Sequence, residues 1–289
     1  MKNQGRVVIV GGSGFIGRNL ARHLADAGIE TLSLSSAQAD LCDASHAEKL
    51  VQLVRADDAL VIASAVTPDK GRDADSQMKN LVMGQTLCSF LSKAKCAQVI
   101  YLSSDAVYND SLSLVNEASP PSPGSFYGIT HLGRELMLAD VLKKSGIPYL
   151  ILRLSILYGS DDTHNSYGPN RFFRSAVAAQ KIALFGNGEE KRDHVFVKDV
   201  CRLIARCLLG HSTGVLNVAT GRSVSFMDVA LAIQALFEGK LRIETSPRAN
   251  PVTYRHYDVT ALLKAFPDFY FTPLERGLEE TFKEIHQLS

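Results

Sequence analysis

The sequence predicts an α/β protein whose first half is a doubly wound parallel sheet, followed by a smaller, irregular C-terminal lobe. Short continuous apolar runs alternate with segments of helical periodicity from residue 7 to residue 154, as expected when helices cover both faces of a parallel sheet. A glycine-rich turn joins the first apolar run to the first helical segment. After about residue 241, four prolines interrupt the chain, which is typical of irregular structure.

The predicted elements of the first half follow one another in a regular order. Val7–Val10 is a β-branched run typical of a strand that is buried on both faces. Ile16, Leu20 and Leu24 then recur at helical spacing, and Gly28 ends this helix. Successive strand, helix and strand segments form right-handed crossovers of a parallel sheet. The same patterns predict strands at residues 30–34, 59–63, 98–102 and 149–154, and helices at residues 44–55, 78–94 and 127–144.

The pattern loosens after Tyr158. Residues 159–170 are polar and rich in glycine, proline and asparagine, which predicts a loop. Ser225 and Asp228 have the spacing of a capping box and begin a helix that continues to about Phe237. We also expect a helix at residues 171–179 and a strand near residues 216–218. The prediction is therefore a first domain over residues 1–158 and a second lobe over residues 159–289, with residues 196–230 returning to the first sheet.

Composition and charge exclude several classes of protein. With 289 residues, 46% of them hydrophobic and 21% charged, the chain can bury a sizeable core and is not expected to be disordered. Its 31 basic and 30 acidic residues leave a net charge of +1, which disfavours binding to nucleic acid. No apolar run approaches the roughly 20 residues of a membrane span, so no membrane partner is expected.

The cysteines and the first residues indicate a cytoplasmic protein. The N-terminus lacks the apolar stretch and the small-residue cleavage site of a signal peptide. The five cysteines include no C-x-x-C pair and have no histidine at ligand spacing, which is typical of reduced thiols. Because no two histidines stand four residues apart beside a glutamate, no metal site is expected.

The glycine-rich turn predicts a dinucleotide cofactor. Gly12, Gly14 and Gly17 form a G-x-G-x-x-G motif between the first strand and the first helix. In that position glycines let the backbone approach a pyrophosphate, and the helix N-terminus attracts its charge.

The end of the second strand bears on the choice of cofactor. An acidic residue is expected there to hold the adenosine ribose of NAD, but this sequence has Ser35 and Ser36. Two serines can form hydrogen bonds with a 2′-phosphate and do not repel it, so the sequence slightly favours NADP over NAD. Asp40 and Leu41 follow and are expected near the adenine, with a solvated loop residue as the alternative for Asp40.

A series of motifs then identifies a family. They are Gly11-x-x-Gly14-x-x-Gly17, the segments 103–108, 127–130, 153–159, 185–188 and 192–200, and Gly214-x-x-Asn217. In this order they resemble the extended short-chain dehydrogenase/reductases, which are nucleotide-sugar epimerases, dehydratases and reductases. The resemblance covers essentially the whole chain and implies a Rossmann domain, an NAD(P) cofactor and a nucleotide-sugar substrate bound by the C-terminal lobe.

The resemblance also implies roles for individual residues. Ser104 matches the residue that forms a hydrogen bond with the reacting oxygen, and Tyr127 matches the tyrosine that exchanges a proton with that oxygen. Asp105 belongs to the substrate site, and Arg192 matches an arginine that binds the nucleotide diphosphate, with Arg248 as a second. The cofactor contacts that the resemblance implies are Gly11, Gly14, Phe15, Ile16, Gly17, Ser35, Ser36, Asp40, Leu41, Ala63, Tyr127 and His131.

These roles have structural alternatives. Tyr127 can instead be a packed aromatic residue, Ser104 a capping residue, and the two arginines members of surface ion pairs. The helix around Ala74–Leu91 mediates dimers in this family, which implies a homodimer, or it covers the sheet of a monomer.

One position departs from the family pattern. The family places a lysine four residues after its tyrosine, where this chain has His131. A unit charge about 4 Å away, at an effective dielectric of about 20, contributes about 4 kcal/mol, or roughly three pKa units, and a neutral imidazole loses most of that effect. Because oxidation needs the tyrosine as a base and reduction needs it as an acid, the change favours a ketosugar reductase over an enzyme that oxidises first.

Two other interpretations of His131 remain open at this point. In the first, His131 becomes protonated beside the phenolate and partly replaces the lysine. In the second, catalysis is lost and the chain is a silent NAD(P)-binding scaffold or sensor. Dehydratase activity is disfavoured, because Ala106 stands where dehydratases have a glutamate. We therefore expect NAD(P)-dependent reduction or epimerisation at a keto or hydroxyl carbon of a nucleotide-activated sugar, with Ser104, Tyr127 and His131 in the catalytic site.

Overall fold

The chain divides into two compact units that alternate along the sequence. The computed structural model describes residues 5–162, 165, 167–248 and 251–287. The first unit consists of Met1–Tyr108, Pro120–Leu154 and Val200–Asn217, and the second of Asn109–Ser119, Ser155–Asp199 and Val218–Ser289. This division differs from the boundary expected at residue 158. The segment that returns to the first unit is shorter than 196–230, and residues 109–119 leave that unit early.

The first unit contains a six-stranded sheet in the order β10-β6-β4-β3-β1-β2. Neighbouring strands from β2 to β6 are parallel. Every residue of β1 is buried, because helices cover both faces of the sheet. The strands are β1 (Val7–Val10), β2 (Thr31–Leu34), β3 (Ala59–Ile62), β4 (Gln98–Ser104), β6 (Tyr149–Leu154) and β10 (Gly214–Val218).

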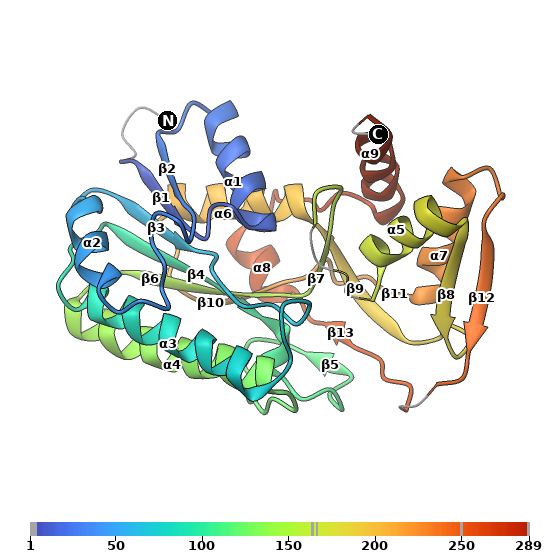
Figure 1. Ribbon diagram of the computed structural model, residues 1–289, viewed down its shortest axis with the longest axis horizontal. Helices are drawn as coiled ribbons and strands as arrows, with labels where there is room; N and C mark the ends of the chain where they lie inside the picture. The colour runs from blue at the N-terminus through green and yellow to red at the C-terminus, as the bar shows by residue number, and fades with distance from the viewer. Residues whose placement is uncertain (1–4, 163–164, 166, 249–250, 288–289) are drawn as a thin grey trace. The chain divides into compact units, whose positions relative to one another are not determined.

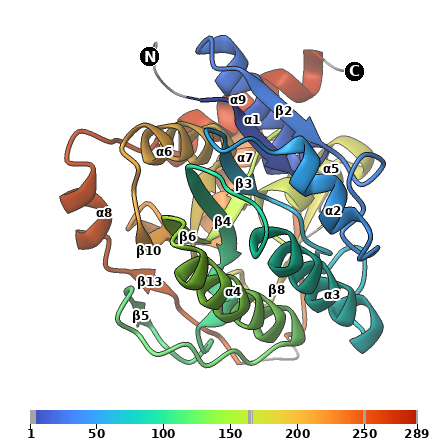
Figure 2. The same ribbon diagram turned by 90° about the vertical axis from the view of Figure 1, so that its left-hand side faces the viewer.

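Helices lie on both faces of this sheet, as the sequence predicts. On one face α2 (His46–Leu53), α3 (Ala74–Leu91) and α4 (Phe126–Ser145) share an apolar core with the strands, and α3 and α4 run side by side in Figure 1 and Figure 2. Figure 1 places α1 (Phe15–Asp26) and α6 (Val197–Leu209) on the opposite face. The helix α3 begins four residues earlier than expected, because Asp73 caps it by accepting a hydrogen bond from Ser76 N.

The second unit is more regular than the sequence suggested. It contains a sheet of β7 (Ile156–Tyr158), β9 (Lys191–Phe196) and β11 (Ser223–Ser225), and two strand pairs. These pairs are β8 (Lys181–Phe185) with β12 (Arg242–Ser246), and β5 (Leu114–Val115) with β13 (His256–Tyr257). The helices are α5 (Pro169–Ala179), α7 (Phe226–Leu236), α8 (Thr260–Ala265) and α9 (Leu274–Gln287).

The expected irregularity after residue 241 is therefore wrong in part. The prolines lie between elements and do not interrupt them: Pro247 follows β12, Pro267 follows α8, and Pro273 directly precedes α9. Proline is tolerated at such boundaries because it needs no amide partner there. The predicted capping box is confirmed, since Ser225 Oγ accepts from Asp228 N at the start of α7. Residues 163, 164 and 166 of the expected loop lie outside the described residues.

No helix in the described part of the chain is long and apolar enough to cross a membrane.

Candidate active site

At Gly11 and Gly17, the turn after β1 has no room for a side chain. Gly11 has a φ of +90°, and a Cβ on it would lie 2.7 Å from Ser64 N. A Cβ on Gly17 would lie 2.3 Å from Gly11 O, so α1 packs directly against the turn. Gly14 begins α1 without a side-chain cap, which leaves the first-turn amides for an anionic ligand. This bare, tightly packed turn fits the pyrophosphate of a dinucleotide.

The residues next to this turn differ in what they can offer a cofactor. Phe15 is buried, whereas Ile16 is half-buried. Ala63 follows β3 and donates its amide hydrogen to Val10 O at 2.8 Å, which places it beside the end of β1.

At the end of β2, local contacts already engage most of the predicted cofactor residues. Ser35 donates from both its amide and its hydroxyl to Gln38 Oε1, at 2.8 and 2.5 Å, and Ser36 is exposed. Asp40 Oδ1 accepts from Cys42 N at 2.9 Å in a local turn. The side chain of Leu41 packs in the apolar core, which leaves only its backbone for a cofactor contact.

Ser104 and Tyr127 meet at the carboxyl end of β4. Ser104 Oγ accepts from Ala106 N at 3.1 Å and lies 3.5 Å from Asp105 Oδ1. Tyr127 belongs to the first turn of α4, and its hydroxyl lies within hydrogen-bonding reach of Ser104. Gly128 makes this approach possible, because a Cβ on it would lie 2.0 Å from Ala106 O in the short 3-10 helix η1 (Asp105–Val107).

Tyr127 is protonated at neutral pH. Burial raises the pKa of its phenol, and the phenol of Tyr101 and the carboxylate of Asp105 raise it further. The Arg134 guanidinium and the hydrogen bond from Ser104 act in the opposite direction. The net effect keeps the proton on Tyr127, so the residue is ready to act as an acid.

His131 is a neutral residue within the core. It is 3% exposed, its Nδ1 shares a 2.9 Å hydrogen bond with Tyr101 Oη, and its Nε2 has no partner in the described structure. Its ring meets the Tyr127 ring edge-on, with the centroids 4.5 Å apart. Burial, with a smaller effect of Arg134, lowers the pKa of His131 to about 3. The imidazolium that would replace the lysine charge therefore does not form at neutral pH.

Arg134 is a member of this cluster that sequence reasoning missed. It lies on α4 and is 1% exposed, with Nη1 donating to Ser64 O at 2.8 Å. Its guanidinium stands 5.1 Å from the centroid of the Tyr101 ring. The available signal was its spacing, since residues 127, 131 and 134 fall on one face of a helix.

A buried ion pair holds α4 against β6 in the same unit. Arg153 and Glu135 are joined by hydrogen bonds of 3.0 and 2.7 Å, and Ser103 donates to the same carboxylate at 2.6 Å. Arg153 also donates to Tyr108 Oη, which donates to Asn217 Oδ1. Two positions of the family motifs, Arg153 and Asn217, therefore serve this scaffold.

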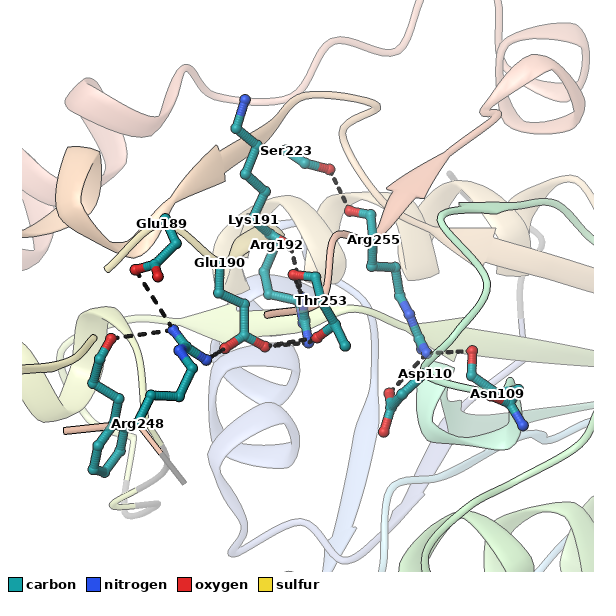
Figure 3. A network of polar contacts seen from close by, with 11 residues as sticks. Asn109, Asp110, Glu189, Glu190, Lys191, Arg192, Ser223, Arg248, Thr253 and Arg255 are labelled. Carbon is teal, nitrogen blue, oxygen red and sulfur yellow. Dashed lines mark hydrogen bonds and ion pairs between the residues drawn. The ribbon is translucent and has the colours of Figure 1, made fainter. Parts of the chain in front are cut away.

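Arg192 and Arg248 meet in the second unit, where Glu190 binds both (Figure 3). Arg248 Nη1 lies 2.8 Å from Glu190 Oε2, and Arg192 forms an ion pair with the other carboxylate oxygen. Arg192 also donates to Thr253 Oγ1 at 2.6 Å. Both arginine side chains are 15% exposed, so these ion pairs are largely shielded from solvent.

No motif in the sequence marks the residues that contact this arginine pair. Glu190 is the shared anion, and Thr253 fixes the guanidinium of Arg192. Nearby in Figure 3, Arg255 pairs with Asp110 at 2.8 Å and donates to Asn109 O at 2.9 Å, which ties the segment after Thr253 to residues 109–110.

The described residues contain no cluster of three or more histidine, cysteine, aspartate or glutamate side chains suited to a metal ion.

Several known proteins are similar to this chain over most of its length. A family model described as "NAD dependent epimerase/dehydratase family" matches residues 7–219. The ADP-L-glycero-D-manno-heptose-6-epimerase of Alkalilimnicola ehrlichii is 25% identical over 304 aligned residues, which cover 94% of this chain and 95% of that relative. The UDP-glucose 4-epimerase of Thermus thermophilus, solved in complex with NAD, has a TM-score of 0.86 at 20% identity over 98% of this chain and 100% of that one. A GDP-L-fucose synthetase from Naegleria fowleri has a TM-score of 0.86 at 16% identity over 100% of this chain and 96% of that one.

Proposed function

The chain belongs to the NAD-dependent epimerase/dehydratase family, and we propose that it reduces or epimerises a nucleotide-activated sugar at a keto or hydroxyl carbon. The observation that carries this proposal is geometric: the first turn of α4, which holds Tyr127, packs on η1 directly after Ser104, and Ser104 acts on the protonated Tyr127 phenol there. A hydroxyl and a phenol at one point can bind a single oxygen atom and exchange one proton with it.

In this proposal each residue has a defined task. The bound nicotinamide supplies or accepts the hydride. Ser104 Oγ forms a hydrogen bond with the reacting oxygen, and Tyr127 Oη gives that oxygen its proton during reduction or removes it during oxidation. Since Tyr127 holds its proton at neutral pH, the reductive direction is the more favourable one. Asp105, 3.5 Å from Ser104 Oγ, borders the substrate.

NADP is the proposed cofactor in preference to NAD. Ser35 and Ser36 end β2 without an acidic side chain, so a 2′-phosphate would meet hydroxyl groups and no repulsion. Accepting the phosphate requires Ser35 to exchange its bond with Gln38 for one to the ligand.

The arginine pair is the proposed binding site for the diphosphate of the substrate. Two guanidinium groups held on one carboxylate show that Arg192 and Arg248 can converge on one anion. A diphosphate would take the place of Glu190 between them.

The proposed oligomer is a homodimer formed through α3 and α4. Met78 of α3 and Ile129 and Leu136 of α4 are large apolar side chains with 49–65% of their surface exposed. Sedimentation measurements on the wild type and on Leu136→Glu test this: a dimer that the charge dissociates is expected, and a monomeric wild type would overturn the proposal.

The first experiment compares NADPH and NADH by fluorescence titration of the purified wild type. Tighter binding of NADPH is expected, and tighter binding of NADH would overturn the serine argument. Turnover of nucleotide-sugar substrates by Tyr127→Phe is then compared with that of the wild type. An oxidoreductase loses most of its rate in this variant, whereas unchanged turnover would exclude Tyr127 as the acid. Cofactor binding without turnover would favour the silent NAD(P)-binding scaffold, and binding of neither cofactor would refute the proposed activity.

A further inference from the structure

The face of α4 that carries Tyr127 holds a positive charge three residues beyond the position of the missing lysine. Tyr127, His131 and Arg134 follow one another at four- and three-residue spacing, so their side chains leave the helix in one direction. His131 is neutral at this position because its pKa is about 3. Arg134 is therefore the cation that this face of the helix offers to Tyr127.

Arg134 is held in an unusual state for a buried guanidinium. It is 1% exposed, and its Nη1 donates to Ser64 O at 2.8 Å. Its Nε and Nη2 have no hydrogen-bond partner among the described residues. The neighbouring carboxylate of Glu135 is already engaged by two hydrogen bonds from Arg153. Burying a cation without a carboxylate partner lowers stability. A buried arginine of this kind is therefore a candidate for a functional role.

A continuous series of contacts joins Arg134 to Tyr127. The guanidinium lies 5.1 Å from the centroid of the Tyr101 ring, and Tyr101 Oη shares a 2.9 Å hydrogen bond with His131 Nδ1. The His131 ring in turn meets the Tyr127 ring, with the centroids 4.5 Å apart. Tyr101 and His131, which link cation and phenol through these contacts, are almost fully shielded from water, since they are 1% and 3% exposed. In this low-dielectric interior a charge acts over a longer range than in water.

The helix α3 leaves room for Arg134. A Cβ added to Gly84 would lie 3.0 Å from Arg134 Cγ and 3.7 Å from Cδ. The glycine at position 84 therefore lets the arginine stem pass between α3 and α4, with its head group turned toward β3 and β4.

We propose that Arg134 is a positioning residue that supplies, through Tyr101 and His131, the positive charge that stabilises the Tyr127 phenolate. This proposal rests on the proposed function, in which the Tyr127 O–H bond breaks and its proton passes to the oxygen of the reduced carbonyl. The phenolate left behind takes a proton from solvent to complete the cycle. Arg134 lowers the free energy of that phenolate, so it assists both reaction directions.

Among the described residues, the other groups that act on the Tyr127 phenol or lie near Arg134 do not supply this charge. Ser104 and Tyr101 on β4 are neutral, and Asp105 on η1 is an anion that opposes ionisation of the phenol. On α3, burial raises the pKa of the Cys88 thiol near Arg134 to about 11, so it stays neutral. On β6, Arg153 is paired with Glu135.

The test measures ionisation of the phenol directly in the ligand-free protein. A fluorinated tyrosine, which is more acidic than tyrosine, replaces Tyr127, and its ionisation is followed by ultraviolet absorbance. A unit charge acting over about 10 Å at an effective dielectric of about 20 shifts a pKa by roughly one unit. Arg134→Met is therefore expected to raise the pKa of the residue at position 127 by about one unit, a tenfold change in its ionisation constant.

Matched variants separate charge from packing. Arg134→Lys keeps the charge and is expected to keep the pKa, and Lys144→Met removes an exposed cation from the same helix and should change nothing. Arg134→Gln, which can still donate to Ser64 O, serves as the neutral variant if Arg134→Met does not fold. In the variant His131→Lys/Arg134→Met, the charge moves to the family position, and the pKa is expected to return to the wild-type value or below.

A pKa at position 127 that is the same in wild type, Arg134→Met and Arg134→Gln would overturn the proposal. This readout needs neither substrate nor cofactor, so it stands even where turnover fails and the proposed function is wrong. With turnover, the alkaline shift of the pH profile for sugar oxidation in Arg134→Met should equal the pKa shift. A loss of rate at every pH without such a shift would assign Arg134 a purely structural role.

Discussion

Replacement of Gly128 by alanine tests how the active site is assembled. In the helix interior such a change normally gains about 1 kcal/mol of helix stability. Here the added Cβ would lie 2.0 Å from Ala106 O and 2.8 Å from Pro123 Cβ, whereas ordinary contact begins at 3.4 Å. The first turn of α4 must therefore move away from η1 by about 1.4 Å, and Tyr127 moves with it, away from Ser104.

The expected cost is large in rate and moderate in stability. A misplacement of about 1 Å of a reacting group can lower the rate about 100-fold, and overpacking typically costs about 1–3 kcal/mol of unfolding free energy. We expect Gly128→Ala to lower kcat about 100-fold, as measured by cofactor absorbance during turnover of a nucleotide sugar. Urea denaturation of the same samples gives the stability change.

Gly133→Ala is the matched control, because it lies on the same helix and its Cβ would meet only the flexible end of Leu81 at 3.2 Å. It should keep the wild-type rate. A Gly128→Ala variant with wild-type kcat would refute the argument that close packing of η1 and α4 sets the distance between Ser104 and Tyr127.

Three further predictions concern the buried Arg153–Glu135 ion pair, the carboxylate of Glu190 and the buried imidazole of His194. Arg153→Met should lower the unfolding free energy by about 3–5 kcal/mol in urea denaturation, because it leaves Glu135 buried without its cation; a loss below about 1 kcal/mol would contradict this. Glu190→Gln should lower the KM for a nucleotide sugar several-fold at unchanged kcat, since it removes the carboxylate that competes with the diphosphate, and a raised KM would show that Glu190 instead holds the arginines in place. His194 is 4% exposed and burial lowers its pKa to about 3. Below pH 6.5 the His194 imidazole therefore binds a proton in the unfolded chain but not in the folded chain, so the unfolding free energy falls as the pH drops from about 6.5 toward 3. At pH 5 this lowers the unfolding free energy by about 2 kcal/mol. The variant His194→Phe should therefore gain about 2 kcal/mol more over the wild type at pH 5 than at pH 8; the same difference between variant and wild type at both pH values would contradict this.

The first unit could be predicted well from sequence because its signals are local. Each buried strand is one apolar run, and each helix has its own periodicity and often its own cap, as Asp73 and Ser125 show. The second unit could not, because its strands are defined by distant partners. Lys181–Phe185 becomes a strand by pairing with Arg242–Ser246, a segment in which apolar and polar residues do not alternate clearly.

The residues of the candidate site likewise fall into those that local motifs predict and those that depend on distant contacts. Ser104 and Tyr127 occur in motifs with recognisable spacing, and the structure brings them together. The sequence around Arg134 does not indicate that this residue is buried, and the sequence around Glu190 does not indicate that it binds two arginines. Burial of Arg134 depends on Gly84, which lies fifty residues earlier in the sequence and on another helix.

The order of segments along the chain affects how the protein can be made. The strand β10 is the last to join the six-stranded sheet, because Ser155–Asp199, a segment of the second unit, is synthesised before it. Until Gly214–Val218 leaves the ribosome, β6 has no neighbour on its outer side, although all but its first residue are buried in the finished protein. An unpaired apolar strand edge readily pairs with other chains. A nascent or truncated chain that ends before Gly214 therefore exposes an aggregation-prone strand.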